Sequence, residues 1–440
     1  MNTTVNLMAH LARPLDRPVR IAVAGAGARG STYAEIAAGL GDRAEIVAVA
    51  EPRPHHRSVF VRRHGLPSSA VFAEWRDLVA AGRLADAVII ATQDADHVAA
   101  AVAFAEAGYD ILLEKPMATD ESDCERIVAA VDKAGVTMAV CHVLRYTPYT
   151  TAVKSLLDNG RIGELMAVQH REPVGFWHFA HSFVRGNWRR ADESTFLLLS
   201  KSCHDLDWLA YLVGQPAMRV SSFGSLRHFR PQAAPAGAGT RCVSCAIEPD
   251  CPYSALRLYR AGLADAQANR PSAKTYFTRI VAPSMTSAEL ETALRDGPYG
   301  RCVYACDNDV VDHQVVNVEY ANGVTASFTL TAFTPMESRH TALFGTHGEI
   351  RGDGRRLQVY DFDGERTEVI DTAPSDGRVS DADAHDGGDT GLITAFVDAL
   401  WHGDPTMIRS GATESLASHR VVFAAERARL DARVVELPAR

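Results

Sequence analysis

Three glycines near the amino terminus constrain the fold of this chain more than any other feature. Gly25, Gly27 and Gly30 follow the apolar run "RIAVA" and precede the predicted helix "STYAEIAAGL". In this G-x-G-x-x-G spacing, the first glycine permits a tight turn, the second lets the backbone approach a pyrophosphate, and the third lets helix and strand pack closely. Amides at the helix start would bind the phosphates. The pattern predicts the dinucleotide-binding turn of a Rossmann domain; a glycine-rich turn without a ligand is the alternative.

An acidic residue at the end of the second predicted strand indicates which dinucleotide binds. Glu51 closes "EIVAVAE", 21 residues after Gly30, where a carboxylate accepts hydrogen bonds from ribose hydroxyls. Because a carboxylate also repels a 2′-phosphate, the sequence favours NAD over NADP. Arg53, His55 and His56 lie close enough to weaken that preference.

Strand and helix patterns alternate from residue 19 to about residue 141, which predicts a doubly wound parallel sheet covered on both faces. The runs "DAVIIAT", "DILLEKP" and "TMAVC" are typical of buried strands. Thr92 and His97 follow the first of these runs, at the sheet edge where cofactors bind. Thr92 would face the cofactor or cap the next helix.

A different pattern begins near residue 150. Apolar and polar residues alternate with period two in "RVSSFGSL", "QVVNVEYANGVTASFTLTAF", "RHTALFGTHGEIRGD" and "LQVYDF", which predicts strands, with a hairpin turn at "ANG". We expect a large, mostly antiparallel open sheet with one face covered by helices, one of them helical from about Ser200. The 440 residues exceed one ordinary core. They divide into a tail (1–18), a Rossmann domain (19–145) and an α/β domain (146–440) that carries an insertion (231–312).

Charge and hydropathy exclude several partners. The net charge of −9 argues against nucleic acid, and no apolar run reaches the roughly 18 residues that span a bilayer. Residues 1–18 lack a basic start followed by an apolar block, so we expect a cytoplasmic protein without a secretion signal.

A lysine stands at the carboxyl end of the strand "DILLEKP", on the predicted binding edge. The 45 basic residues include five lysines, and lysine, unlike arginine, can lose its proton when buried. Oxidising an alcohol requires a base for the hydroxyl proton, and a lysine with a lowered pKa suits that task. Lys115 is therefore a catalytic candidate, with a structural ion pair to Glu114 as the alternative.

Three segments in order, "RIAVAGAGARG", "ATQDADHVAAAVAFAEAGYDILLEKPMA" and "RYTPYTTAVKSLLDNGRIGEL", resemble the glucose–fructose oxidoreductase/inositol dehydrogenase/MocA family. The resemblance implies a Rossmann domain, an α/β domain whose open sheet often mediates oligomerisation, a nicotinamide cofactor, and sugar or cyclitol substrates. It implies that Lys115 is the catalytic lysine and that a dimer or tetramer forms. The cofactor-binding candidates are then Gly25, Gly27, Ala28, Arg29, Gly30, Glu51, Thr92, His97, Glu114, Lys115 and His142, the last in place of an asparagine.

The resemblance also implies a second catalytic element, Asp-x-Gly-x-His-x-x-Asp, which corresponds to "SKSCHDLD" here. His204 and Asp207 match the family pattern, Ser200 replaces the first aspartate, and Lys201 is an added cation at the predicted helix start. We expect Lys201 to make the site more positive. Such a site would lower the pKa of a substrate hydroxyl, bind a carboxylate or sulfonate, or stabilise an enolate. The alternative is a solvent-exposed Lys201 and a core His204.

Aromatic and basic residues precede that helix in "GFWHFAHSFVRGNWRR". Aromatic faces and guanidinium groups suit a sugar ring and its hydroxyls, although they equally suit a packed, ion-paired loop. The predicted substrate-binding residues are Arg145, Tyr146, His178, Trp188, Arg189 and Asp205.

Five of the eight cysteines fall between residues 242 and 306. A C-x-x-C pair with further thiolates can hold tetrahedral zinc, and an insertion with little core of its own would gain folding energy from it. The preferred ligands are Cys242, Cys245, Cys251 and Cys302, with Cys306 as a substitute. An iron–sulfur cluster and inert buried thiols are the alternatives.

The sequence thus predicts hydride transfer between a nicotinamide and a sugar or cyclitol secondary alcohol, with Lys115 and His204 handling the proton. An NAD-dependent glycoside hydrolase, which oxidises transiently and cleaves by elimination, is the second hypothesis. A non-catalytic ligand sensor is the third.

Overall fold

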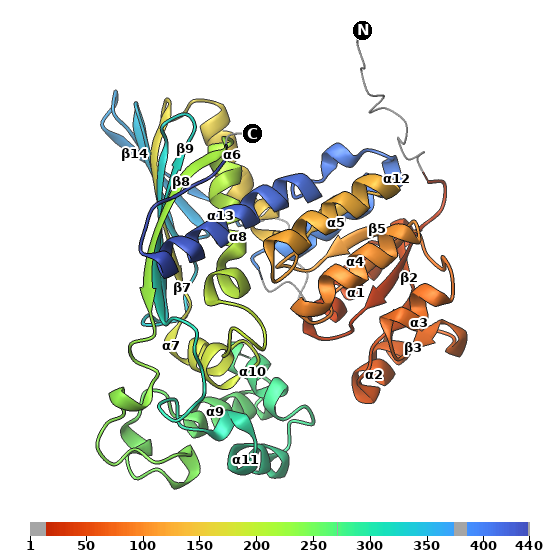
Figure 1. Ribbon diagram of the computed structural model, residues 1–440, viewed down its shortest axis with the longest axis vertical. Helices are drawn as coiled ribbons and strands as arrows, with labels where there is room; N and C mark the ends of the chain where they lie inside the picture. The colour runs from red at the N-terminus through yellow and green to blue at the C-terminus, as the bar shows by residue number, and fades with distance from the viewer. Residues whose placement is uncertain (1–14, 271, 374–384, 439–440) are drawn as a thin grey trace.

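The computed structural model describes residues 15–270, 272–373 and 385–438, which form two sheets with their covering helices (Figure 1). Residues 1–14 of the predicted tail lie outside the described part. The first described residues pack against the carboxyl-terminal part of the chain, where the Leu15 amide donates to the carbonyl of Trp401 at 2.8 Å.

The amino-terminal sheet has six strands in the order β3-β2-β1-β4-β5-β6, and all its pairings are parallel. Its buried strands are short apolar runs, as expected for a sheet covered on both faces. This confirms the predicted doubly wound α/β fold. The strands are β1 (Val19–Ala24), β2 (Ala44–Ala50), β3 (Val71–Phe72), β4 (Ala87–Ile90), β5 (Asp110–Leu113) and β6 (Met138–Val140), and the helices are α1 (Ala28–Ala38), α2 (Pro54–His64), α3 (Trp75–Ala80), α4 (His97–Glu106) and α5 (Glu121–Ala134).

A helix from the far end of the chain covers part of this sheet. Helix α12 (Gly388–His402) packs beside α1 (Figure 1). Its apolar residues Leu392, Phe396 and Leu400 share one buried cluster with Val23 and Ile89 of β1 and β4. The chain therefore crosses to the second sheet and returns to complete the first core.

The second sheet has nine strands in the order β14-β13-β12-β11-β7-β10-β9-β8-β15. The β7–β10 pairing is parallel and the others are antiparallel, so the mostly antiparallel open sheet is confirmed. Gly323, with φ of +83°, lies in the predicted "ANG" turn between β9 and β10. The strands are β7 (Leu165–Pro173), β8 (Ala217–Ser225), β9 (His313–Tyr320), β10 (Thr325–Thr331), β11 (His340–Gly345), β12 (Gly348–Gly352), β13 (Arg356–Asp361), β14 (Arg366–Asp371) and β15 (Val435–Glu436).

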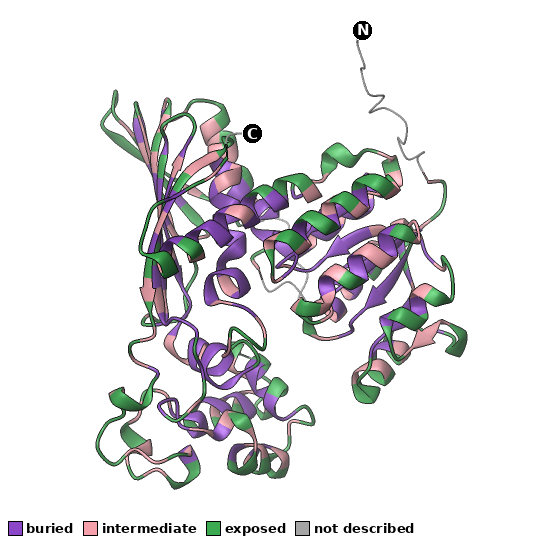
Figure 2. Cartoon of the chain, viewed as in Figure 1, coloured by how far each residue is buried: buried purple, intermediate pink, exposed green. Residues whose placement is uncertain are grey.

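Helices cover one face of the nine-stranded sheet (Figures 1 and 2). Alternate residues of β9 are buried, which matches the period-two pattern. Helices α8 (Leu197–Val213) and α13 (Ala412–Asp431) pack together on this face, and Trp208 of α8 donates to Thr150 of α6 (Pro148–Asp158) at 2.8 Å. Helix α8 begins at Leu197 rather than near Ser200. The three leucines at positions 197–199 form its first turn and are buried.

The insertion contains helices α9 (Ala255–Gln267), α10 (Ala273–Val281) and α11 (Ser287–Asp296), beside the short α7 (Phe176–Phe179). Tyr259, Leu290 and Leu294 belong to a separate buried cluster. The expectation that this segment has little core of its own is therefore wrong. Among the described residues, the structure contains no helix with the length and apolar character that crossing a bilayer requires.

Candidate functional site

The glycine turn after β1 has the geometry of a pyrophosphate cradle. Gly25 has φ of +94°, and a Cβ there would overlap the carbonyl of Ala91, while a Cβ on Gly30 would overlap the carbonyl of Gly25. Both positions therefore require glycine. Gly27 precedes α1 without a side-chain cap, so the first amides of that helix, from Ala28 and Arg29, remain available to an anion.

The carboxylate predicted at the ribose end is held in place. Glu51 is 1% exposed and accepts hydrogen bonds from the Ala26 amide at 2.8 Å and from Arg53 Nε at 2.6 Å. Burial raises the pKa of Glu51, but the hydrogen bonds from Arg53 outweigh burial and the pKa is lowered. The cation that was expected to weaken the NAD preference is thus paired with the carboxylate itself. Thr92 caps no helix: its hydroxyl lies 3.4 Å from the Gln93 carbonyl.

Side chains from two distant helices fix the loop that carries Lys115. His97 Nδ1 lies 2.7 Å from the Pro116 carbonyl, and the Met117 amide donates to His419 Nε2 at 3.0 Å. The Lys115–Pro116 peptide bond is cis. Lys115 Nζ donates to the carbonyl of Ser200 on α8 at 2.8 Å. The fold therefore brings together the two elements that the sequence predicted to be catalytic.

Glu114 pairs with an arginine instead of the neighbouring lysine side chain. Arg29 Nε donates to Glu114 at 2.8 Å, Tyr33 donates to the same oxygen at 3.0 Å, and Arg29 also pairs with Asp389 of α12. Within the described residues, Lys115 Nζ has no carboxylate within 4.0 Å, so the alternative of a Glu114–Lys115 ion pair is not observed. The Arg29 and Glu114 side chains, both predicted to bind cofactor, bind each other.

The charged residues of α8 form a network that the sequence did not predict. Lys201 Nζ lies 3.0 Å from Glu172 of β7, and Arg339 lies 2.9 Å from the other oxygen of Glu172. Arg339 also pairs with Asp205 and donates to His204 Nε2 at 2.7 Å. Two cations are therefore balanced by two carboxylates, which corrects the expectation that Lys201 makes the site more positive. Lys201 is the fifth residue of α8, so it does not stand at the helix start. Asp205, which was predicted to bind substrate, instead forms a buried ion pair with Arg339.

His204 is neutral and has a defined tautomer. Burial lowers its pKa well below the usual value, and the charges of Arg339 and Lys115 act in the same direction against the opposing effect of Asp205. Because arginine can only donate, His204 Nε2 accepts and Nδ1 carries the proton. His204 Nδ1 is buried and has no hydrogen-bond partner in the described part of the chain.

Three residues expected near the ligand belong to the protein interior. Arg145 forms a bidentate pair with Asp207, with both distances 2.7 Å, and is 4% exposed. The hydroxyl of Tyr146 bonds Ser410 Oγ at 2.9 Å. His142 is fully buried 3.6 Å from Asp207, and burial lowers its pKa to about 3. The assignment of Arg145 and Tyr146 to substrate binding is corrected, because their polar groups are satisfied inside the core.

The loop before α8 divides into an inner and an outer part. His178 packs its ring 4.8 Å from Phe277, and burial, followed by the charge of Lys201, lowers its pKa. Arg189 instead forms a bidentate pair with Asp307, at 3.0 Å for both contacts, and Trp188 is 39% exposed. Of these predicted substrate residues, His178 lies beside the charged network, whereas the Arg189 guanidinium is engaged at the surface.

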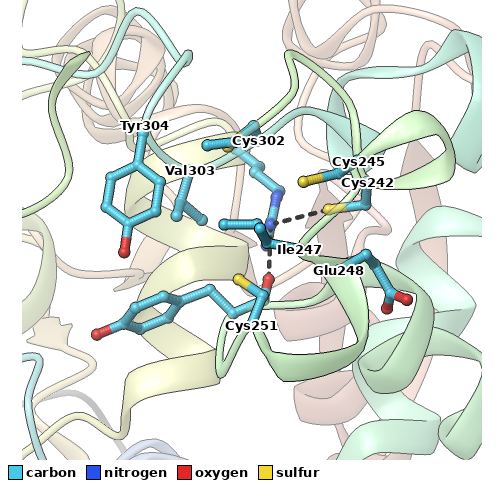
Figure 3. A pocket seen from close by; sticks show the side chains of 11 residues that line it. Cys242, Cys245, Ile247, Glu248, Cys251, Cys302, Val303 and Tyr304 are labelled. Atoms are coloured by element: carbon cyan, nitrogen blue, oxygen red, sulfur yellow. Dashed lines mark hydrogen bonds between the residues drawn. The ribbon is translucent and has the colours of Figure 1, made fainter. Parts of the chain in front are cut away.

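Four cysteines of the insertion surround one small pocket (Figure 3). They are the predicted ligands Cys242, Cys245, Cys251 and Cys302, all with free thiols. Cys306 does not line this pocket. Across the described ranges, no three potential ligands are positioned to hold a metal ion with the present side-chain rotamers.

Arg339, Glu172, Asp389 and His419 complete the site but were not predicted. Glu172 lies in β7 and Arg339 directly precedes β11, and their sequence neighbours give no sign of buried charge. Asp389 and His419 lie in helices near the carboxyl terminus. No local sequence pattern links these residues to the segment that carries Glu114, Lys115 and Pro116.

The buried histidines predict how stability depends on pH. Burial lowers the pKa of His419 to about 4, whereas an unfolded histidine titrates near 6.5. As pH falls from about 6.5 to about 4, the unfolded state binds a proton that the folded state excludes. The free energy of unfolding should therefore fall by up to about 1.4 kcal/mol per pH unit for this histidine.

Urea denaturation of wild type and His419→Gln at pH 7 and pH 5 checks this effect. The variant should lose less stability on acidification than wild type, and the control His402→Gln, at an exposed position, should behave as wild type. Equal losses in all three proteins would contradict the assignment.

Both sheets correspond to described protein families and solved structures. A family model of the oxidoreductase family NAD-binding Rossmann fold (GFO_IDH_MocA) matches residues 19–142, and its C-terminal alpha/beta domain matches residues 154–437. The chain resembles YteT of Bacillus subtilis, named as an oxidoreductase (27% identity over 61% of this chain and 60% of that protein), and inositol 2-dehydrogenase 1 of Saccharopolyspora erythraea (30%, 46% and 57%). These alignments span 60% or less of the relatives' lengths.

A solved oxidoreductase from Agrobacterium radiobacter, in complex with NAD+, L-tartaric acid and magnesium, has the same fold. It superposes with a TM-score of 0.68 at 18% identity, over 95% of this chain and 98% of that one. Through both its Rossmann domain and its C-terminal domain, the chain belongs to the Gfo/Idh/MocA family of oxidoreductases.

Proposed function

We propose that the protein is an NAD-dependent dehydrogenase that transfers hydride between a nicotinamide and a secondary alcohol of a sugar or cyclitol. The observation that carries the proposal is the position of Lys115. Lys115 stands at the carboxyl edge of the parallel sheet, where cofactors bind. Its side chain extends from there to α8, where the amine donates to the Ser200 carbonyl. Family membership and the inositol dehydrogenase relative support the substrate class.

The residues of this chain fit a dinucleotide. The cradle formed by Gly25, Gly27 and Gly30 would hold the pyrophosphate, and Glu51, whose pKa is lowered, against the effect of burial, by the hydrogen bonds from Arg53, would accept hydrogen bonds from the ribose. A bound nicotinamide would accept or return the hydride. Nothing else in the site has to change oxidation state.

Lys115 and His204 divide the handling of the substrate oxygen in this proposal. Lys115 Nζ takes the hydroxyl proton as hydride leaves the same carbon, and the Ser200 carbonyl orients the amine throughout. His204 cannot serve as the base at Nε2, because Arg339 already donates to that nitrogen. In this proposal its Nδ1–H, which is buried and unpartnered among the described residues, donates to the substrate oxygen once the substrate enters and stabilises the negative charge that develops there. Lys201, held by Glu172, orients a further hydroxyl.

The Glu51–Arg53 pair predicts how cofactor preference can be changed. Wild type should bind NAD at least about tenfold more tightly than NADP, because the buried carboxylate repels a 2′-phosphate. In Glu51→Ala, Arg53 loses its partner and becomes available to that phosphate, so the NAD/NADP affinity ratio should fall about tenfold or more. Fluorescence titration with both dinucleotides measures this ratio. Glu45→Ala, at an exposed position of the same strand, is the control, and an unchanged ratio in Glu51→Ala would refute the assignment.

The reaction class is tested by incubating the protein with NAD and a panel of sugars, cyclitols and glycosides, following nicotinamide absorbance and product masses together. The proposal predicts NADH and a ketone product in equal amounts. Release of an aglycone without net NADH would instead identify the glycoside hydrolase, and no turnover with any alcohol would indicate a ligand sensor.

We further propose that the open face of the nine-stranded sheet mediates a homo-oligomer. Phe223 of β8 and Val315 of β9 lie opposite each other in register, and they are 66% and 38% exposed. An apolar pair on an uncovered sheet face favours contact with a second copy. Sedimentation of wild type and Phe223→Asp would show a dimer or tetramer that the substitution dissociates; a monomeric wild type would exclude this assembly.

A further inference from the structure

A fully buried arginine that precedes α8 and contacts the insertion lacks the negative partner that its charge requires. Arg185 is 1% exposed, and its Nε and Nη2 donate to the carbonyls of Arg301 and Tyr253 at 2.7 and 2.8 Å. Its Nη1 has no hydrogen-bond partner, and within the described residues no carboxylate lies within 4.0 Å of the guanidinium. Burying an unpaired cation is strongly unfavourable, so some anionic group is expected beside it.

The cysteine pocket is the group that lies there. Arg185 lines the pocket together with Cys242, Cys245, Cys251 and Cys302, and its Nη2 is 3.8 Å from Cys242 Sγ. Four neutral thiols supply no charge, but four thiolates around one divalent cation carry a net charge of −2. Such a cluster would compensate the guanidinium, and the guanidinium would stabilise the cluster through N–H···S contacts, as partners of metal ligands do.

The backbone brings the fourth cysteine to the other three. Arg241 and Arg301 form an isolated antiparallel bridge, and the Cys302 amide donates to the Thr240 carbonyl at 2.9 Å. Cys242 and Cys302, which directly follow the bridged residues, are thereby held side by side although about 60 residues separate them. The Gly239 amide lies 3.3 Å from Cys245 Sγ, a backbone N–H···S contact of the kind that supports a bound thiolate.

Cys306 has a different environment from the four pocket cysteines. Its thiol donates to the Cys302 carbonyl at 3.2 Å and does not line the pocket. The geometry therefore selects Cys302 over Cys306, a choice that sequence spacing alone did not settle.

We propose that Cys242, Cys245, Cys251 and Cys302 bind one zinc ion as a tetrathiolate site that ties the two ends of the insertion together. Figure 3 shows these four side chains among the residues that line the pocket. As the side chains stand, no three potential ligands among the described residues are placed to hold a metal ion, so the proposal requires the four thiols to reorient toward one point. The site is structural, because all four positions are filled by protein ligands and none is left open for a substrate. It is independent of the dehydrogenase proposal.

The full-length protein, purified with reductant, tests the site directly. We expect one equivalent of zinc by elemental analysis and native mass spectrometry, released stoichiometrically by a thiol-reactive mercurial. Cobalt(II) exchanged into the protein should show the intense sulfur-to-metal absorption and visible bands of tetrahedral thiolate coordination. Iron in place of zinc, a disulfide among these cysteines, or a reduced wild-type protein that binds neither zinc nor cobalt would overturn the proposal.

Variants define the ligand set. Cys242→Ser and Cys251→Ser should lower metal content to well below half an equivalent, whereas Cys306→Ser and the buried Cys124→Ser should retain one equivalent. If a ligand variant fails to fold, chelator titration of wild type still decides, because removing zinc should lower the melting temperature of wild type and the loss should reverse on adding zinc back. Equal metal content in Cys251→Ser and Cys306→Ser would refute the assignment. Lys115→Met should keep the ion, so failure of the catalytic proposal leaves this test intact.

Discussion

Replacing Lys115 with methionine should reduce kcat by about 10²- to 10⁴-fold, the usual contribution of a positioned acid–base group. Methionine keeps the length and apolar stem of the side chain but removes the amine that reaches Ser200. NAD binding should change by less than about threefold, since the glycine turn and Glu51 make separate contacts. Steady-state kinetics with NAD and the alcohol identified in the substrate panel, together with a fluorescence titration of NAD, measure both quantities.

Two further variants separate chemistry from charge. Lys115→Arg keeps a cation but cannot release a proton at accessible pH, so it should be nearly as inactive as the methionine variant. Lys133→Met removes an exposed lysine of α5 and should leave kcat unchanged. If Lys115→Met turned over within about threefold of wild type, the amine would not be the base, whatever the fold.

Features set by local sequence were predictable. The glycine turn was recognisable because backbone conformation and close packing at Gly25 and Gly30 exclude other residues. The parallel sheet followed from short apolar strands alternating with helices, and the second sheet from period-two alternation. Lys115 stood out because a strand ends there at the binding edge. Each of these inferences needed only neighbours within a few residues.

Features set by distant contacts were not predictable. Arg29 meets Asp389 across 360 positions, and His204 meets Arg339 across 135. The sequence shows where an arginine stands but does not show which carboxylate pairs with it. For this reason the sequence suggested substrate binding for Arg145 and Asp205, whose partners are Asp207 and Arg339. It likewise suggested that Lys201 adds charge to the site, because sequence spacing does not reveal that Glu172 pairs with it. The packing of α12 on the first sheet was not predictable for the same reason, because it depends on contacts between segments far apart in the sequence.

The buried pair formed by Arg145 and Asp207 should contribute strongly to the stability of the protein. Asp207→Asn keeps the shape of the side chain but leaves the Arg145 guanidinium buried without a counter-ion. Breaking a buried pair in this way costs about 3–5 kcal/mol. Urea unfolding followed by tryptophan fluorescence should show that loss, and Asp207→Asn combined with Arg145→Met should recover part of it because the orphaned charge is then removed.

An exposed pair of the same geometry provides the matched control. Arg260 and Glu291 also form a bidentate contact, with both distances 2.8 Å, but their side chains are 52% and 43% exposed. Solvent screens their attraction, so Glu291→Gln should cost no more than about 1 kcal/mol. The large difference expected between two pairs with nearly identical contacts follows from burial alone. Equal losses for Asp207→Asn and Glu291→Gln would mean that Asp207 is accessible to solvent, and that the corrected place of Arg145 inside the core is itself wrong.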